Sequence, residues 1–160
     1  MRRTAARLAA LLLTGVAALA WPGAASADDL PGPTLSGRLV GVRDLCLTVR
    51  AETVTGYQPV QAWNCEGGAA QYWRLGVDGT LQAVGKCLDV WHGGTRAGTG
   101  VGVYACNGTG AQQWQYLTDT TLQNPQSGLC LNVPLVGTAG IDLNIWGCYL
   151  DYSQRWRFAY

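Results

Sequence analysis

The chain has 160 residues, of which 48% are hydrophobic and 13% charged, and its 11 basic and 10 acidic side chains give a net charge of +1. The arginines are scattered and no basic run occurs, so the sequence does not predict electrostatic capture of nucleic acid or of an anionic membrane. The length suits one domain with a substantial core.

The N-terminal segment has the pattern of a secretory signal peptide. Three arginines precede the apolar run 8–21, and a small-residue Ala-Ser-Ala cleavage motif ends at Ala27. The apolar run is too short to span a bilayer. We therefore predict a signal peptide over residues 1–27, a short N-terminal extension over 28–34, and one secreted, extracellular domain over 35–160 without membrane insertion.

The rest of the chain has the pattern of short β-strands separated by tight turns. Segments 45–49, 101–104 and 141–146 are rich in aliphatic and aromatic residues, and several alternate. Asp78-Gly79 and Asn107-Gly108 are typical turn dipeptides. No stretch after residue 30 sustains a helical period with caps, so we expect an all-β domain.

One compound motif occurs three times at a period near 42 residues. Each copy reads Cys-Leu-x-Val, then an aromatic residue two positions before a second cysteine, then Gln-x-Trp, which begins at Gln71, Gln112 and Gln154. Self-similarity of this length indicates repeated structural units that share one core. The predicted units cover residues of about 35–76, 77–119 and 120–160.

The six cysteines fall two to a unit. In an exported chain they predict three disulfides, because the compartment is oxidising. Sequence alone allows 15 connectivities, but three equivalent units favour one bridge within each. The predicted pairs are Cys46–Cys65, Cys87–Cys106 and Cys130–Cys148. A zinc site is disfavoured, since no Cys-x-x-Cys occurs and His92 is the single histidine, and we expect neither metal nor cofactor.

The in-register motifs resemble the ricin B-type lectin family, also called carbohydrate-binding module family 13, over about residues 35–160. That resemblance implies a β-trefoil, with a six-stranded barrel capped by three hairpins around a pseudo-threefold axis. Such closure removes exposed strand edges. The large apolar rings of the three Gln-x-Trp motifs are expected to fill the shared core. These are Trp73, Trp114 and Trp156.

The resemblance also implies a shallow sugar pocket on each unit. An aromatic ring stacks on the apolar face of the sugar, and an aspartate with amide side chains binds its hydroxyls. The middle unit keeps the full set, namely Asp89, Tyr104, Asn107 and Gln112. The third unit has asparagine in place of the aspartate, and its candidates are Asn132, Asn144, Trp146 and Gln154, with Tyr149 nearby. In the first unit Thr48 replaces the aspartate and Glu66 follows the second cysteine, which leaves Trp63 and Gln71.

The sequence thus predicts a non-catalytic lectin whose partner is a carbohydrate of the galactoside or xylan type. A glycosidase needs two facing carboxylates, and Asp89 has no evident partner. A serine-histidine-aspartate centre would depend on His92, in a glycine-rich turn without a nucleophile motif. Trp91 and His92 either extend the middle pocket or form an exposed turn. The alternative function is a trefoil scaffold that binds a protein, such as a protease, through its loops.

Overall fold

The computed structural model describes residues 34–50, 56–134 and 139–160. The predicted signal peptide lies outside this range, as does the predicted extension except for Thr34. The described residues belong to one compact unit. None of their helices is long and apolar enough to cross a membrane.

The expectation of an all-β domain is confirmed. The strands are β1 (Leu35–Val40), β2 (Cys46–Val49), β3 (Gln58–Trp63), β4 (Tyr72–Leu75), β5 (Leu81–Ala83), β6 (Lys86–Val90), β7 (Val101–Tyr104), β8 (Gln115–Tyr116), β9 (Leu122–Asn124), β10 (Leu129–Asn132), β11 (Ile141–Asp142), β12 (Asn144–Trp146) and β13 (Arg157–Ala159). The helices of the described chain are single 3-10 turns, η2 (Val42–Asp44), η3 (Ala69–Gln71), η4 (Trp91–Gly93), η5 (Gly110–Gln112) and η6 (Tyr152–Gln154). The predicted strand 141–146 is interrupted at Leu143, whose backbone N–H donates to the Val60 carbonyl at 3.1 Å.

Seven strands pair antiparallel in a closed ring, in the order β1–β2–β3–β7–β6–β5–β4 and back to β1. Strand β11 adds to β3 and β13 adds to β1. The remaining strands form a separate sheet in the order β12–β10–β9–β8. Closure hides the strand edges, as expected for a β-trefoil.

The ring has one strand more than the six-stranded barrel that the sequence predicted. The difference arises in the third unit, because most of its strands pair among themselves in the four-stranded sheet. Three isolated bridges add to these pairings. Gly100–Asn144 joins the second unit to the third, whereas Thr80–Gln113 lies within the second unit and Thr121–Arg155 within the third.

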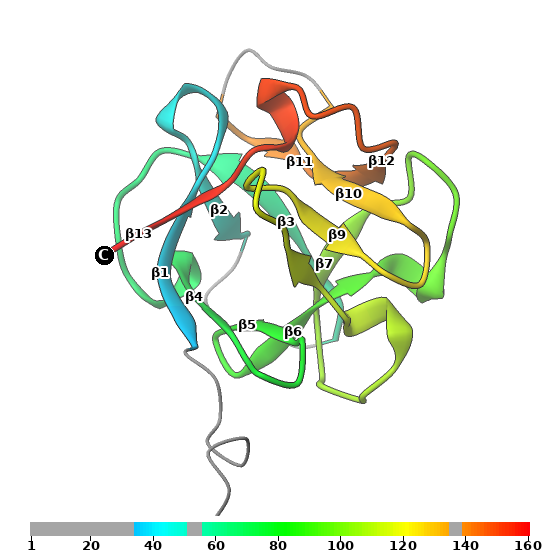
Figure 1. The fold of residues 1–160 in the computed structure, drawn as a ribbon. Helices are drawn as coiled ribbons and strands as arrows, with labels where there is room; N and C mark the ends of the chain where they lie inside the picture. The colour runs from blue at the N-terminus through cyan, green and yellow to red at the C-terminus, as the bar shows by residue number, and fades with distance from the viewer. Residues whose placement is uncertain (1–33, 51–55, 135–138) are drawn as a thin grey trace, which may run out of the picture. The chain divides into compact units, whose positions relative to one another are not determined.

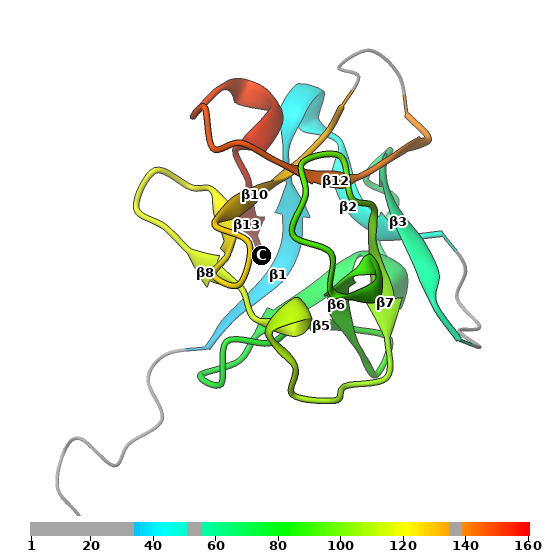
Figure 2. The same ribbon diagram turned by 90° about the vertical axis from the view of Figure 1, so that its right-hand side faces the viewer.

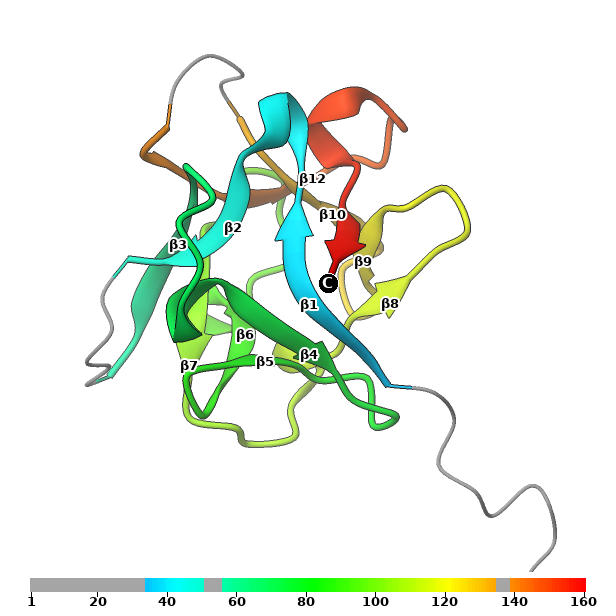
Figure 3. The ribbon, with the colours of Figure 1, turned by 90° about the vertical axis from the view of Figure 1, so that its left-hand side faces the viewer.

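The three units follow one another around a common centre. In Figure 1 the colours of the strands run from blue and cyan to green through the first unit, and β9, β10 and β12 of the third run from yellow to orange on the other side. Figure 2 shows β6 and β7 side by side, which are the strands that carry the middle pocket. Figure 3 shows β13 against β1, so the last strand of the chain pairs with the first.

The tryptophans of the three Gln-x-Trp motifs lie in the core, as predicted. Each is at most 1% exposed, and each indole N–H donates to the carbonyl of the leucine in its own Cys-Leu-x-Val motif. The bonds run from Trp73 to Leu47 (2.7 Å), from Trp114 to Leu88 (3.0 Å) and from Trp156 to Leu131 (3.2 Å). The two ends of each motif therefore meet in the core, which explains why they recur together.

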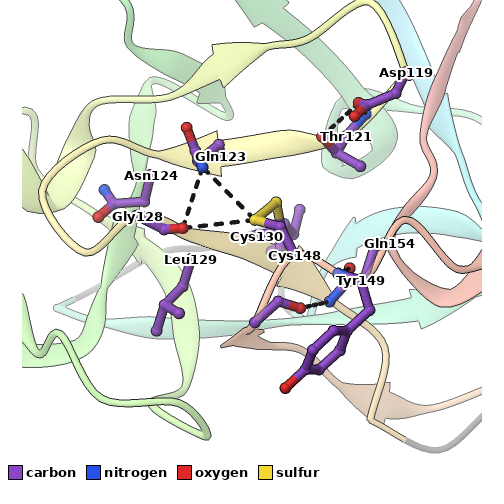
Figure 4. The surroundings of a disulfide bond; sticks show 12 residues. Asp119, Thr121, Gln123, Asn124, Gly128, Leu129, Cys130, Cys148, Tyr149 and Gln154 are labelled. Atoms are coloured by element: carbon purple, nitrogen blue, oxygen red, sulfur yellow. Dashed lines mark hydrogen bonds between the residues drawn. A yellow bond between two sulfur atoms is a disulfide. The ribbon is translucent and has the colours of Figure 1, made fainter.

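The three predicted disulfides are formed. Each closes a loop of 18 or 19 positions, which in the chain-entropy account contributes about 3 kcal/mol. Figure 4 shows the third bridge, Cys130–Cys148, beside Gln123, whose amide donates to the Gly128 carbonyl at 3.1 Å. Within the described ranges, no three histidine, cysteine or acidic side chains gather as metal ligands would.

Candidate carbohydrate-binding site

The middle unit carries an open pocket of about 440 Å³ around Asp89. Asp89 lies on β6 directly opposite Gly102 of β7, and Tyr104 is opposite Cys87. Opposed residues of an antiparallel pair share a face, and so do residues two apart along a strand. Asp89 and Tyr104 therefore project from one face of this ribbon, and both line the pocket.

Asp89 supplies the charged acceptor of the pocket. It is 7% exposed, and its Oδ2 accepts a hydrogen bond from Nε2 of Gln112 at 2.8 Å. Burial raises the pKa of the Asp89 carboxyl above its usual range, and the Gln112 hydrogen bond and nearby His92 oppose that rise. In the described chain Gln112 is the one hydrogen-bonding partner of the Asp89 carboxylate, so acceptor capacity remains for a ligand hydroxyl.

Gln112 holds the Asp89 carboxylate in position through the hydrogen bond from its Nε2. Its side chain is 0% exposed, its Oε1 accepts from the backbone N–H of Asn107 at 2.8 Å, and its Nε2 also donates to the carbonyl of Ala105 at 2.9 Å. We predicted it as a sugar ligand, but a side chain without exposed surface acts on a ligand only through the groups it orients. The structure thus gives Gln112 a positioning role.

The same arrangement recurs in the other two units. Oε1 of Gln71 accepts from the backbone of Glu66 at 2.9 Å, and Oε1 of Gln154 accepts from that of Tyr149 at 2.9 Å (Figure 4). Both glutamines are buried. The glutamine of Gln-x-Trp is therefore a support for the loop after the second cysteine, and the tryptophan anchors that support in the core.

Tyr104 and Asn107 are the exposed members of the predicted set. The Tyr104 ring is 42% exposed, which leaves a face for an apolar sugar surface. Oδ1 of Asn107 accepts from the backbone and hydroxyl of Thr109, at 3.0 and 2.8 Å. Its Nδ2 has no hydrogen bond to the described part of the chain, so it remains a donor for a ligand.

Trp91 and His92 both form a turn and line the pocket, so the two alternatives left open by the sequence hold together. They belong to η4, in which His92 has a φ of 51°, a left-handed conformation that glycine adopts at less cost. The two rings lie 5.3 Å apart, and Trp91 is 46% exposed. The middle pocket is therefore wider than the predicted set of residues indicated.

Two further lining residues come from neighbouring units and were missed by sequence reasoning. Gln126 of the third unit donates to the Gly93 carbonyl at 2.9 Å and so holds the rim of the pocket. Tyr57 of the first unit enters the pocket from the start of β3. A signal for it existed in the sequence, because the residues eight positions before the second cysteine of the other units are Gly98 and Gly140.

The Tyr57 hydroxyl is buried and has no hydrogen-bonding partner among the described residues. Burial, and to a lesser degree the charges of Asp89 and Asp142, raise the pKa of this hydroxyl well above its usual range. The group therefore stays protonated beside Asp89. Its ring lies 4.5 Å from that of Trp91 at an interplanar angle of 61°.

The third unit carries a second pocket of about 320 Å³, lined by Asn132, Asn144, Trp146 and Tyr149 among others. Nδ2 of Asn132 donates to Oδ1 of Asn144 at 3.0 Å, and its Oδ1 accepts from the Ser153 hydroxyl at 3.0 Å. Trp146 is 42% exposed. Three predicted residues thus line this pocket, but the residue at the position of Asp89 is the neutral Asn132, which already has protein partners. The carboxylate that lines this pocket, Asp151, accepts from the backbone N–H and the hydroxyl of Ser153.

The first unit has no carboxylate at the corresponding position. The Thr48 hydroxyl donates to the Cys46 carbonyl and accepts from Nε2 of Gln71, both at 2.9 Å. The indole N–H of Trp63 donates to Glu66 at 3.2 Å. The polar side chains of this unit therefore hydrogen-bond to one another or to the backbone.

The closed strand ring, the three equivalent units and the pockets on two of them define a β-trefoil with lectin-type sites. The chain belongs to the ricin-type β-trefoil lectin domain family, whose model matches residues 35–156. It is therefore a carbohydrate-binding domain of the ricin B type.

Individual proteins agree with this assignment. The chain is 33% identical to an agglutinin of Ricinus communis over 133 residues, which are 82% of this chain and 23% of the agglutinin. Its structure is similar to that of an agglutinin from Abrus precatorius, with a TM-score of 0.72, 29% identity, and coverage of 79% of this chain and 48% of the other. A designed threefold-symmetric protein, ThreeFoil, gives a TM-score of 0.70 at 28% identity, over 78% of this chain and 98% of its own. The chain spans 16% to 24% of the length of the curated relatives that it matches.

Proposed function

We propose that this chain is a secreted, non-catalytic lectin module that binds galactoside or xylan-type sugars, chiefly in the middle pocket. One observation carries the proposal: the carboxylate of Asp89 is fixed by Gln112 at the base of a pocket that also exposes the ring of Tyr104. A sugar has an apolar face for the ring and hydroxyls for the carboxylate. The pocket of the third unit, with the neutral Asn132 at the position of Asp89, is a weaker second site.

Two further observations support the remaining parts of the proposal. Among the described residues, Asp89 is the one acidic side chain that lines the middle pocket, whereas hydrolysis of a glycoside requires two carboxyl groups across the scissile bond. The three disulfides suit an oxidising compartment outside the cytosol. Secretion itself is tested by the mass of the exported protein, which should correspond to a chain that begins at Asp28.

Binding is best tested by NMR titration, because a single shallow pocket yields dissociation constants on the order of 0.1 to 1 mM. We expect galactose, lactose or xylobiose to shift the amide resonances around Asp89 and Tyr104. The isosteric change Asp89→Asn should lower that affinity by about 10-fold or more, because it replaces charge-assisted hydrogen bonds with neutral ones. Asp119→Asn is the matched control, since this partly exposed aspartate caps a turn through Thr121 and lines neither pocket.

The proposal fails if the wild type binds none of these sugars, or if both substitutions reduce binding equally. Inhibition of a protease by a protein that binds no sugar would instead favour the alternative trefoil scaffold.

A further inference from the structure

We infer that the middle pocket contains a second saccharide subsite, built by Trp91 of the middle unit and Tyr57 of the first, so that its preferred ligand has at least two linked sugar units. This inference rests on the proposed function, because it names the size of the ligand for the same pocket. It is carried by the placement of three aromatic rings along one ribbon, and by residues that the other two units do not have.

The β6–β7 ribbon presents two of these rings, those of Tyr104 and Trp91, with Asp89 between them. Every second residue of this stretch lies on the same face, and the pairs across the ribbon are Cys87 with Tyr104 and Asp89 with Gly102. Trp91 continues the series opposite Gly100, because its backbone N–H donates to the Gly100 carbonyl at 3.0 Å. The row on one face of the ribbon therefore begins at Tyr104, passes Asp89 and ends at Trp91. All three side chains line the same pocket.

Tyr57 fills the middle of this row from the neighbouring unit. A Cβ at Gly102 would lie 2.6 Å from Cζ of the Tyr57 ring, so the tyrosine ring occupies the space above this glycine. Four positions before their second cysteines, the other units have Gln61 and Asn144. The middle pocket thus replaces an amide side chain with an aromatic ring from another unit.

Trp91 is exposed but held in place. The centroid of the Tyr57 ring lies 4.5 Å from that of Trp91 in an edge-to-face type of contact, and the His92 ring centroid lies 5.3 Å from it on the same turn. A ring that is already fixed loses little freedom when a ligand stacks on it, and this raises affinity. The corresponding residues in the first and third units are Arg50 and Pro134, so this stacking surface is particular to the middle pocket.

The spacing of the rings decides how many sugar units they serve. The position opposite Tyr104 is four residues from Trp91, which is roughly 13 Å of strand at about 3.3 Å per residue. One sugar ring held between two aromatic faces would need them about 7 to 8 Å apart, since each contact takes about 3.5 to 4 Å. Tyr104 and Trp91 therefore stack on different sugar units, and Asp89 binds hydroxyls between them.

Paired ligands of different length test this inference. Dissociation constants for xylose and xylobiose, and for galactose and lactose, are measured by NMR with the wild type, Trp91→Ala, Tyr57→Ala and Tyr57→Phe. For the disaccharide of the pair that binds, Trp91→Ala and Tyr57→Ala should lower the affinity about 5- to 10-fold and leave the monosaccharide within about twofold. Tyr57→Phe keeps the ring against Trp91 and should stay within about twofold for both ligands.

The indole N–H resonance of Trp91 gives a direct readout of the second subsite. It is assigned by its loss in Trp91→Ala, and it should shift with the disaccharide and not with the monosaccharide.

Tyr72→Ala is the matched control, because this exposed tyrosine on β4 lines neither pocket. Thermal melts verify that each variant is folded, and Trp91→Ala, at a half-exposed position, tests the subsite even if Tyr57→Ala unfolds. Equal loss of both ligands in Trp91→Ala, or no loss, overturns the second subsite. Failure of the proposed function is distinct, since in that case the wild type binds no sugar.

Discussion

At the scale of single residues, the middle pocket depends on one carboxylate in an unfavourable setting. Asp89 is mostly buried, and its burial is offset in part by Gln112 and His92. A carboxyl group in this position binds a proton more tightly in the folded chain than in the unfolded one, so its ionisation lowers the free energy of unfolding as the pH rises through that range. The pocket therefore keeps a partly desolvated charge, which a sugar hydroxyl can satisfy.

Sugar binding at the middle pocket should consequently depend on pH. Sugar hydroxyls donate to the ionised carboxylate, so affinity is full above the raised pKa of Asp89 and falls as the pH is lowered through it. The fall should begin at a higher pH than an exposed aspartate would give. NMR titrations between about pH 3 and pH 7 measure this, and Asp89→Asn should show a flat profile over the same range. Affinity that rises on acidification would contradict the assignment of Asp89 as the acceptor.

At the scale of elements, the Gln-x-Trp motif joins a strand, a turn and a loop. In the middle unit, η5 places Gln112 so that its amide bonds both Asp89 on β6 and the loop after β7, while Trp114 reaches the Leu88 carbonyl in the core. Local patterns correctly predicted the burial of the tryptophan, because a large apolar ring that recurs in every unit is expected to lie in the core. They did not predict the role of the glutamine, because burial depends on which way the 3-10 turn faces.

The substitution Gln112→Met tests this support, because it keeps the side-chain volume and removes its hydrogen bonds. It leaves Oδ2 of Asp89, the Ala105 carbonyl and the Asn107 N–H without this partner, and should lower the free energy of unfolding by about 3 kcal/mol. Urea denaturation followed by circular dichroism measures the change. Gln115→Met, at an exposed position on β8, should stay within about 0.5 kcal/mol. If the two variants lose the same stability, Gln112 is not the support described.

At the scale of the whole molecule, the sequence predicted the features that lie within one unit and missed the contacts between units. The cysteine pairs, the buried tryptophans and the trefoil class follow from motifs written within about 42 residues. Tyr57 reaches Trp91 across 34 positions and Gln126 reaches Gly93 across 33, and no periodic pattern connects such pairs. The closed β-trefoil was predicted, but the number of strands in its ring was not, because that number depends on how β3 of one unit pairs with β7 of the next.

That β3–β7 pairing requires a glycine. Gly102 lies opposite Pro59 in the pair, and a Cβ there would overlap the Gln58 backbone oxygen and the Tyr57 ring. The Gln58 oxygen belongs to the β3 backbone and cannot move away without disturbing the pairing with β7. Gly102→Ala should therefore lower the free energy of unfolding by about 2 to 3 kcal/mol, as overpacking does elsewhere. Gly100→Ala is the matched control two residues away on the same ribbon, where a Cβ meets no atom within 4 Å, and it should change stability by about 0.5 kcal/mol or less. Chemical denaturation of the two variants compares them directly. Equal stability of the two variants would mean that the ring of strands is not closed at this contact. A loss of stability in Gly102→Ala alone would show that the closure of the fold depends on the same glycine that makes room for Tyr57 in the middle pocket.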